Sequence, residues 1–481
     1  MGGAWERGAV ADGDQQGGGG PDADAGRTTA LLTGLVLPED GERIVHGTVD
    51  FTSGYFLRAA ALAAEAGCGL GFIHAHPGGR GWQALNTVDH AAEAAFAAQT
   101  QVITGRPLVG LTFAGTDAGH GARIWQQHAP RHYLPTEAES VRGAGDRLAV
   151  TFNDRLLPVP TATTRQVRTV SAWGAPAQAD LARLHIGIVG CGSVGMLIVE
   201  ALARTGIQRL SLLDFDTVED VNLDRLLHAT ARDVRLHRAK ADLAAHAARR
   251  AATAAHFRAT PHEASVVEPD GFAAAADCDV LFSCVDRPWP RAALNLLAHT
   301  HLIPVVDGGI AVDARGGRLR GAAWRAHVAA PGRACLECLG QYDPAHVQAE
   351  RDGSLDDPAY ITGLPADHPL RRQENVFVFS TGAAAAQLTQ FLTMATAPGG
   401  IADTGAHLYH LTTGTLDRRE EGCTPGCPYD GPLLALGDDT PVTVTGRHPA
   451  AEQARATRTR AAHRWPLRAR RAVDDLLHRL G

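Results

Sequence analysis

Three groups of side chains in this sequence have the types and spacings that chemistry requires. The first begins at 186-IGIVGCGSVG-195, where an apolar run leads into Gly190, Gly192 and Gly195. Glycines at this spacing permit a tight turn in which backbone N–H groups and a helix N-terminus approach a phosphate. Asp214, at the end of the next apolar run, can bind ribose hydroxyls. Dehydrogenases and ATP-using enzymes share both features, so this group alone predicts only a nucleotide site.

Charged residues downstream narrow the chemistry. The segment 214-DFDTVEDVNLDRLLH-228 carries Asn222 and Arg225, and Asp286 follows a later apolar run. Between them lies Lys240, the one lysine among 45 basic residues. Taken separately, Arg225 can be a surface residue, Lys240 a solvated helix residue and Asp286 a helix N-cap. Taken together, these readings would require that the one lysine of the chain lies at this position by accident.

Four of the eight cysteines form the second group. Cys335-x-x-Cys338 and Cys423-x-x-x-Cys427 are two chelating pairs. Four thiolates suit tetrahedral Zn²⁺ and leave no open position, which predicts a structural zinc site. The alternative is four buried cysteines without a metal.

The third group lies within 74-HAHPGGRGWQALNTVD-89. His74 and His76 flank one residue, so on a strand both side chains point to the same face, and Asp89 begins the next predicted helix. Two histidines and a carboxylate are ligands that zinc accepts. The alternative is two hydrogen-bonded strand histidines without a metal.

The elements that must position these groups predict two α/β domains. Residues 27–130 alternate strand-like runs with Ala-rich helical stretches. Residues 181–430 repeat strand, turn and helix, which predicts a doubly wound, mainly parallel Rossmann-like sheet. The strand-like runs are 30–37, 70–76 and 107–113 in the first domain and 186–190, 209–216, 279–286 and 303–310 in the second.

The remaining segments are predicted to be peripheral. Residues 1–26, rich in Gly, Asp and Ala, are expected to form a disordered leader. Residues 131–180 connect the two domains. Residues 431–481 are an arginine-rich tail whose helices we expect to present a basic face to solvent.

Composition excludes several classes of function. The formal net charge of −7 over 481 residues is no signature of nucleic-acid binding, so no specific nucleic acid is expected as a partner. No run approaches the roughly 20 apolar residues of a membrane-spanning helix, and the N-terminus lacks the order of a signal peptide. We therefore predict a cytoplasmic protein without membrane association.

The glycine loop, the Asp-x-Asp strand end, Asn-Leu-x-Arg, the lysine and the later aspartate occur in one order that resembles the ThiF/MoeB family. The adenylating domain of that family is shared with ubiquitin-activating enzymes. The resemblance covers roughly residues 165–427, and it implies a zinc ion at the paired cysteines and a site for ATP and Mg²⁺. The implied nucleotide-binding residues are Gly190, Gly192, Gly195, Asp214, Asp216, Asn222, Arg225, Lys240, Asp286 and Arg168.

The resemblance also implies what the charged residues do. Arg225, Lys240 and Asp286 would be catalytic, because they would stabilise the charge on the α-phosphate and the departing pyrophosphate, with Asp286 holding Mg²⁺. Asp214 would hold the ribose. Arg168, in a segment that precedes the glycine loop, would reach the ATP of a second subunit, which implies a homodimer.

Thioester-forming members of the family use a further cysteine after the first zinc pair. The corresponding segment here, residues 339–377, contains no cysteine. Cys68, Cys191, Cys278 and Cys284 lie in or beside predicted strands or in the glycine loop, where buried structural thiols are expected. The implied chemistry therefore stops at the acyl-adenylate, which an external amine or thiol would consume.

The histidine group resembles the JAB/MPN zinc isopeptidases over about residues 27–115. That family places a serine where this chain has Asn86 and a catalytic glutamate where it has Arg27. Without a carboxylate base, hydrolysis should be slow, so we expect a degenerate domain that still binds zinc or a ubiquitin-like partner. An active peptidase with Glu39 or Glu42 as the base is the alternative.

These observations lead to one principal hypothesis. The chain is expected to be an ATP-dependent adenylyltransferase that activates the C-terminal carboxylate of a small ubiquitin-like protein or peptide. The alternatives are a bifunctional enzyme whose first domain also removes the modifier, a non-catalytic scaffold and, more remotely, an oxidoreductase. Hydride transfer has no use for the Asn-Leu-x-Arg element and the lysine.

Overall fold

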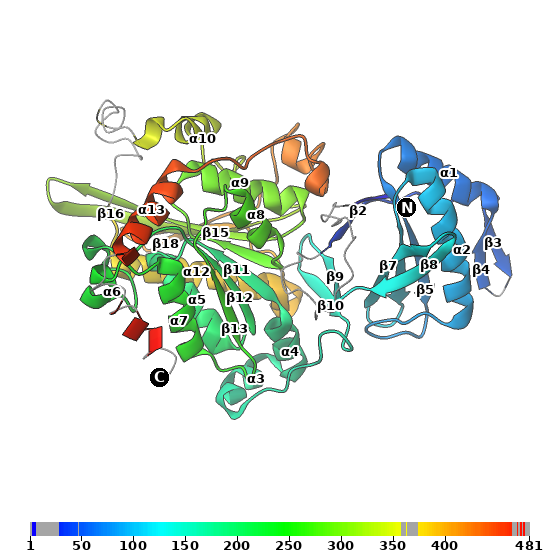
Figure 1. Cartoon of the computed structure of the whole chain (residues 1–481), viewed down its shortest axis with the longest axis horizontal. Helices are drawn as coiled ribbons and strands as arrows, with labels where there is room; N and C mark the ends of the chain where they lie inside the picture. Colours follow the sequence, from blue (N-terminus) through cyan, green and yellow to red (C-terminus); the bar gives the residue numbers. More distant parts are fainter. Residues whose placement is uncertain are drawn as a thin grey trace.

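The computed structural model of this protein describes residues 2–5, 28–46, 48–356, 362 and 374–463, together with five residues near the C-terminus. Figure 1 shows two α/β units, a larger one built on strands β11 to β18 and a smaller one built on β1, β2 and β5 to β8. A hairpin of two strands lies between them. The two predicted α/β domains are thus present as two separate sheets.

The larger unit is an eight-stranded sheet with the order β13-β12-β11-β14-β15-β16-β17-β18. The first five strands pair in parallel, which confirms the predicted Rossmann-like sheet, and the last three add an antiparallel extension that the sequence did not predict. In sheet order the strands are Arg258–His262, Arg209–Leu213, His185–Val189, Val280–Ser283, Val305–Arg315, Arg318–Ala329, Ala406–His410 and Thr415–Arg419.

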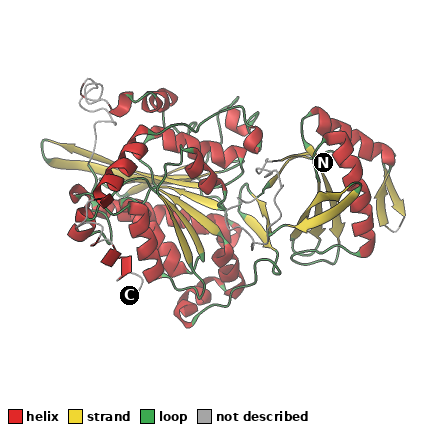
Figure 2. Cartoon of the chain, in the orientation of Figure 1, coloured by secondary structure: helices red, strands yellow, loops and turns green. Residues whose placement is uncertain are grey.

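Helices cover both faces of this sheet (Figure 2). Helices α5, α7 and α12 pack on one face, and α8 and α9 pack on the other. The helices of the unit are α5 (Ser193–Thr205), α6 (Ala231–Arg235), α7 (Lys240–Ala251), α8 (Pro269–Ala276), α9 (Pro288–Thr300), α10 (Pro344–Arg351), α12 (Phe377–Thr396) and α13 (Pro449–His463).

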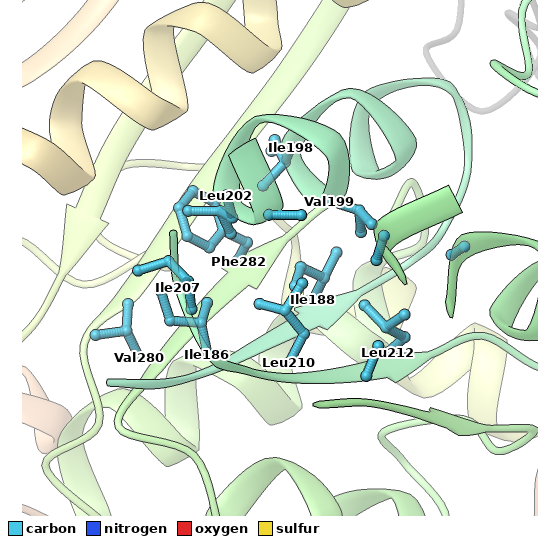
Figure 3. Packing of buried hydrophobic residues seen from close by; sticks show 14 of the residues in the cluster. Ile186, Ile188, Ile198, Val199, Leu202, Ile207, Leu210, Leu212, Val280 and Phe282 are labelled. Atoms are coloured by element: carbon cyan, nitrogen blue, oxygen red, sulfur yellow. The ribbon is translucent and has the colours of Figure 1, made fainter. Parts of the chain in front are cut away.

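The core beneath α5 explains why the chain adopts this arrangement. Every residue of β11 is buried, as expected for a central parallel strand that is covered on both faces. Helix α5 buries Val199 and Leu202, three residues apart, on the same face, and these pack over Ile186, Ile188 and neighbouring strand residues (Figure 3). The carboxyl ends of the parallel strands therefore meet at one edge of a rigid sheet, where α/β proteins bind ligands.

The smaller unit is a six-stranded sheet with the order β2-β1-β5-β6-β7-β8. Its strands are β2 (Ala30–Gly34), β1 (Gly2–Trp5), β5 (Gly69–His76), β6 (Leu108–Ala114), β7 (His120–Ala129) and β8 (His132–Glu137), and its helices are α1 (Ser53–Glu65) and α2 (Thr87–Thr104). Strands β3 (Arg43–His46) and β4 (Thr48–Phe51) form a separate antiparallel pair.

Two predicted boundaries of this unit are wrong. Residues 2–5, predicted to belong to a disordered leader, form a strand that pairs with β2 and β5. Backbone hydrogen bonds hold a strand in a sheet whatever its composition, so a glycine-rich segment can complete one. Strand β8 pairs with β7, so the unit extends beyond residue 130.

The predicted connecting segment is ordered and belongs largely to the larger unit. Strands β9 (Ser140–Gly143) and β10 (Ala149–Phe152) form the hairpin, and helices α3 (Val167–Trp173) and α4 (Ala175–Arg183) follow. Leu148 and Phe152 of this segment join the hydrophobic core of the larger unit. The buried residues of this segment contact partners that lie far along the chain. The segment therefore shows no regular spacing of apolar residues from which its elements could be predicted.

The predicted solvated tail is also wrong for residues 431–463. Leu433, Ala435 and Val444 are buried, and α13 lies on the larger unit. Arg455 and Arg458 form ion pairs with acidic residues of that unit. The basic face thus has protein partners, which a composition-based reading cannot identify.

Candidate functional site

The glycine loop connects β11 to α5 at the carboxyl edge of the sheet. Gly190 has a φ of +94°, and a Cβ there would lie 2.6 Å from the carbonyl oxygen of Cys284. A Cβ on Gly195 would collide with the carbonyl oxygen of Gly190. Gly192 forms the N-cap of α5 and faces open space. The loop is therefore closely packed underneath and leaves the N-terminus of α5 accessible to an anion.

Asp214 fixes the shape of this loop. Its carboxylate accepts hydrogen bonds from the backbone N–H of Cys191 at 2.7 Å and of Asp216 at 2.8 Å. Burial raises the pKa of Asp214 to about 6, and the nearby Lys240 opposes that rise. Because both carboxylate oxygens hold backbone groups, Asp214 organises the turn as well as facing the cavity described below.

Lys240 begins α7 and points back toward the strand ends. Its Nζ lies 2.8 Å from Oδ2 of Asp216, and its side chain is 14% exposed. Burial alone would lower the pKa of Lys240, but Asp214 and Asp216 raise it, so the ammonium stays charged. The reading of Lys240 as a solvated helix residue is therefore wrong.

Asn222 and Arg225 lie in the turn between β12 and α6. The amide oxygen of Asn222 accepts a hydrogen bond from the backbone N–H of Glu219, which closes a short 3₁₀ turn. Nη1 of Arg225 donates to the carbonyl oxygen of Val221 at 2.7 Å and to the carboxylate of Asp224. The guanidinium is partly exposed and retains donors for a ligand.

Asp286 follows β14 and is exposed. Helix α9 begins after it with Arg287 as the N-cap residue, so the reading of Asp286 as a helix cap is wrong. An exposed carboxylate at the end of a central parallel strand is a suitable ligand for a hydrated Mg²⁺ ion.

One cavity of about 670 Å³ brings most of the predicted nucleotide-binding residues together. Gly195 lies beneath the loop and Arg168 is exposed on α3, so neither belongs to the lining. The predicted residues that line the cavity are Gly190, Gly192, Asp214, Asp216, Asn222, Arg225, Lys240 and Asp286.

A buried charge network at the floor of this cavity was missed. Asp307 on β15 accepts hydrogen bonds from Ser283 Oγ at 2.6 Å, from Arg291 Nε at 3.0 Å and from Arg325 Nη1. Burial would raise the pKa of Asp307, but the two guanidinium groups lower it to about 2. Asp307 itself, a charged residue within the apolar run at 303–310, could have indicated this network. Its partners could not be identified, because they lie on distant elements.

The lining also contains residues from two segments that sequence reasoning left aside. Trp324 and Arg325 come from β16, the first strand of the antiparallel extension. His448 and Ala450 come from the predicted tail. No sequence signal marked these residues, because their proximity to the site depends on the tertiary fold.

The four paired cysteines converge in the larger unit. The four sulfur atoms all lie within 4.8 Å of one another; they belong to Cys335, Cys338, Cys423 and Cys427. The Sγ atoms of Cys335 and Cys427 are 3.7 Å apart, and burial raises the pKa of Cys423 to about 12. Four thiolates packed this closely suit a tetrahedral metal cation that neutralises them.

The other cysteines lack the properties of nucleophiles. Burial raises the pKa of the thiols of Cys68, Cys191 and Cys284 above the usual range, and Cys278 is buried. Cys284 lines the cavity, yet its thiol is held protonated by its surroundings.

The smaller unit brings its own candidate ligands together. One ligand atom from each of His74, His76 and Asp89 lies within 4.8 Å of the others. Oδ2 of Asp89 is 3.3 Å from His74 Nε2 and 3.1 Å from His76 Nε2. Burial lowers the pKa of His74, which favours the neutral imidazole that metals bind. Glu93 lies 3.8 Å from His74 but is buried against Arg123.

Among the described residues, no helix is long and apolar enough to cross a membrane.

Comparison with known proteins identifies the larger unit. The model of the ThiF family matches residues 163–405. The tRNA threonylcarbamoyladenosine dehydratase of Escherichia coli (strain K12) is 34% identical over 143 residues, which are 29% of this chain and 52% of that protein. The molybdopterin-synthase adenylyltransferase of the same strain is 34% identical over 122 residues, which are 25% of this chain and 47% of that protein.

The chain thus spans about half the length of the curated relatives it matches. Among solved structures, Escherichia coli MccB with ATP gives a TM-score of 0.44 at 16% identity, covering 56% of this chain and 75% of that chain. The family match extends over just over half of the 481 residues and includes the glycine loop, Lys240, Asp286 and the first cysteine pair. The chain belongs to the ThiF family.

Proposed function

We propose that this protein is an ATP-dependent adenylyltransferase that activates the C-terminal carboxylate of a small ubiquitin-like protein or peptide. The observation that carries the proposal is one cavity in which a phosphate-binding loop meets Lys240, Arg225 and Asp286. The ThiF family match and the molybdopterin-synthase adenylyltransferase among its relatives support it.

The charges of the cavity suit adenylation at the α-phosphate. A carboxylate oxygen of the second substrate forms a bond to the α-phosphorus, the bond from that phosphorus to the bridging oxygen breaks, and pyrophosphate leaves. Lys240 and Arg225 would stabilise the charge that builds on these oxygens. Asp286 would hold Mg²⁺, which supplies further charge neutralisation at the phosphates.

The antiparallel extension offers a surface for the carboxylate substrate. Gly309 pairs with Arg325, and Ile310 with Trp324, across β15 and β16, and all four line the cavity. Trp324 stacks on Tyr409 with ring centroids 4.4 Å apart, which fixes an apolar wall. An extended chain end with small residues would fit against such a sheet surface.

The acyl-adenylate would pass to an external amine or thiol. Residues 339–377 contain no cysteine, and the thiols of Cys191 and Cys284 are kept protonated by burial. In a homodimer, Arg168, which is exposed on α3, would contact the nucleotide of the partner subunit. The four-cysteine cluster would hold a structural zinc ion.

Exchange of labelled pyrophosphate into ATP tests this function. With Mg²⁺ and a panel of ubiquitin-like proteins and peptides with free C-termini, we expect exchange with at least one substrate. Lys240→Ala and Asp286→Ala should each reduce the rate by about 100-fold or more, as loss of a charge-stabilising group does in other active sites. The matched control is Arg235→Ala, an exposed arginine outside the cavity, which should retain the rate. Full exchange in both site variants would contradict the assignment.

We propose a second metal site in the smaller unit, at His74, His76 and Asp89. The convergence of their ligand atoms supports it. Hydrolysis by this site should be slow, because two carboxylates that could act as the base are held in ion pairs. Glu93 pairs with Arg123, and Glu42 pairs with Arg58. The JAB/MPN resemblance of this unit remains a hypothesis, with cleavage of a C-terminally extended ubiquitin-like substrate as its test.

Zinc stoichiometry separates the two proposed metal sites. Two zinc ions per chain are expected in the unmodified protein and one each in His74→Ala and Cys338→Ser. The matched control is Cys68→Ser, which should keep both ions because Cys68 lies outside either cluster. An unchanged zinc content in His74→Ala would contradict the proposed metal site in the smaller unit.

A further inference from the structure

The C-terminal segment, defined here as residues 444–463, reaches the nucleotide cavity. The carbonyl oxygen of Val444 accepts a hydrogen bond from Trp289 Nε1 at 2.7 Å, and the backbone N–H of Gly446 donates to Val267 at 2.7 Å. These contacts direct His448 and Ala450 into the lining of the cavity. The segment is therefore part of the wall of the site.

His448 is the central side chain of this wall. It is 6% exposed, and its ring meets those of Phe215 and Trp289 edge-on, with centroids 5.0 Å and 5.6 Å away. Its Nε2 lies 4.0 Å from the carboxylate of Glu350, which also accepts a hydrogen bond from the backbone of Trp289. Phe215 lies between Asp214 and Asp216, so His448 contacts the same turn that carries the acidic pair.

Ion pairs attach the segment to three elements around the cavity. Arg455 forms two hydrogen bonds to Glu268, at 2.8 Å and 2.6 Å, just before α8. Arg458 pairs with Asp242 on α7 at 2.9 Å and with Glu263 after β13. Both arginines are partly buried, so these pairs are better protected from screening by solvent and salt than exposed ones.

The geometry of the sheet indicates which part of a nucleotide this wall would meet. In the proposed site, phosphates would bind at the N-terminus of α5, and the ribose would bind at the acidic strand end of β12. The base then extends toward β13, the next strand of the sheet. At that end the cavity is lined by Phe215, Ala264, Val266, His448 and Ala450.

We propose that the C-terminal segment forms the wall against the nucleobase and that His448 is the side chain that positions the base. The proposal rests on the nucleotide site of the proposed function. It extends that site to a segment beyond the residues matched by the family model.

Calorimetric titration with two probes, Mg–ATP and inorganic tripolyphosphate, tests the proposal in the full-length protein. Tripolyphosphate occupies the phosphate end without a base. In His448→Ala, the affinity for ATP should fall roughly fivefold to tenfold, the range of one lost aromatic contact, while tripolyphosphate binding changes less than about twofold. His448→Phe, which keeps a ring against Phe215 and Trp289, should recover most of the loss.

The two probes also distinguish the possible failures. An unmodified protein that does not bind ATP would overturn both this inference and the proposed function. ATP binding that is lost in Lys240→Ala but unchanged in His448→Ala would overturn the inference alone. Equal losses for ATP and tripolyphosphate in His448→Ala would also overturn it, because they would show a general disturbance of the site.

A double-mutant cycle tests whether the ion pairs act through His448. Arg455→Ala should weaken ATP binding in the unmodified protein and have little further effect in His448→Ala. The matched control is Arg447→Ala, which removes an exposed ion pair to Glu452 within the segment and should leave the affinity unchanged. Independent, additive losses in the cycle would contradict a positioning role for Arg455.

Discussion

Individual carboxylates of the larger unit differ in what surrounds them, and that difference sets what each can do. Asp286 is exposed and can exchange ligands, whereas Asp307 is buried between Arg291 and Arg325 and is fully engaged. Asp214 lies between these extremes, because it holds two backbone N–H groups and also faces the cavity.

Loss of the Asp307 charge should strongly destabilise the protein. Asp307→Asn leaves two largely buried guanidinium groups without their counter-charge, which should lower the free energy of unfolding by about 3–5 kcal/mol. Asp313→Asn on the same strand is the matched control, because its pair with Arg315 is exposed and should contribute less than about 1 kcal/mol. Chemical denaturation of the two variants measures the difference; equal losses would contradict the buried network.

The sequence predicted those charged residues whose roles follow from local motifs. Lys240 and the later Asp286, which follows an apolar run, occur in a recognisable order, and both line the cavity. The link between Asp307 and Arg325 was not predictable, because it depends on the pairing of β15 with β16 in the folded sheet.

At the scale of elements, the glycine loop determines how closely α5 approaches the strand ends. Position 195 requires glycine, because the carbonyl oxygen of Gly190 occupies the space that a Cβ would fill. Gly192, in contrast, has open space beside it. The two glycines therefore have different physical reasons for their presence, although the sequence motif treats them alike.

Alanine substitutions should separate the two glycines. Gly195→Ala forces α5 away from the loop and should cost about 1–3 kcal/mol of stability through overpacking. Gly192→Ala, with a φ of −79° and no neighbouring atom, should cost at most about 0.5–1 kcal/mol, the preference of an N-cap for glycine over alanine. Thermal unfolding of both variants is the measurement, and an equal or larger loss in Gly192→Ala would refute this account of the loop.

Periodicity predicted the elements that bury a continuous apolar face and missed those that depend on distant partners. Three of the five parallel strands, β11, β12 and β14, were predicted to within three residues at each end. No strand was predicted at β13, and β15 extends five residues beyond the predicted run. Helix α13 was misread as solvent-exposed, because Glu268 and Asp242, the partners of Arg455 and Arg458, lie 187 and 216 residues earlier in the sequence. Its position beside the site could not be predicted either.

In the whole molecule, a smaller α/β unit with its own candidate metal ligands accompanies the ThiF-family unit (Figure 1). Two α/β domains were predictable from the alternation of strands and helices. The antiparallel extension and the packing of the tail were not, since both depend on contacts between segments far apart in the chain.

Buried histidines should make the stability of the whole chain fall in mild acid. Burial and the nearby His327 lower the pKa of His299 in α9 to about 4, below the 6.5 of an unfolded histidine. Because the folded state favours the neutral ring, this contribution is complete above about pH 6.5 and is lost as the pH falls toward 4, at a cost on the order of 3 kcal/mol.

Comparison of two histidine variants measures this effect. His299→Phe should flatten the dependence of unfolding free energy on pH between about 6.5 and 4. The matched comparison is His299→Leu, a second uncharged replacement, which should give the same flattened dependence. An identical pH profile for His299→Phe and the unmodified protein would show that His299 does not titrate in this range.

The most direct test of the central claim is to identify which phosphate bond of ATP breaks. ATP labelled at the α-phosphate would be incubated with the purified protein, Mg²⁺, a carboxylate substrate that supports exchange, and an amine or thiol acceptor. Adenylation predicts labelled AMP, with pyrophosphate released, and no signal from Lys240→Ala. Labelled ADP would show transfer of the γ-phosphate instead and would contradict the proposed function.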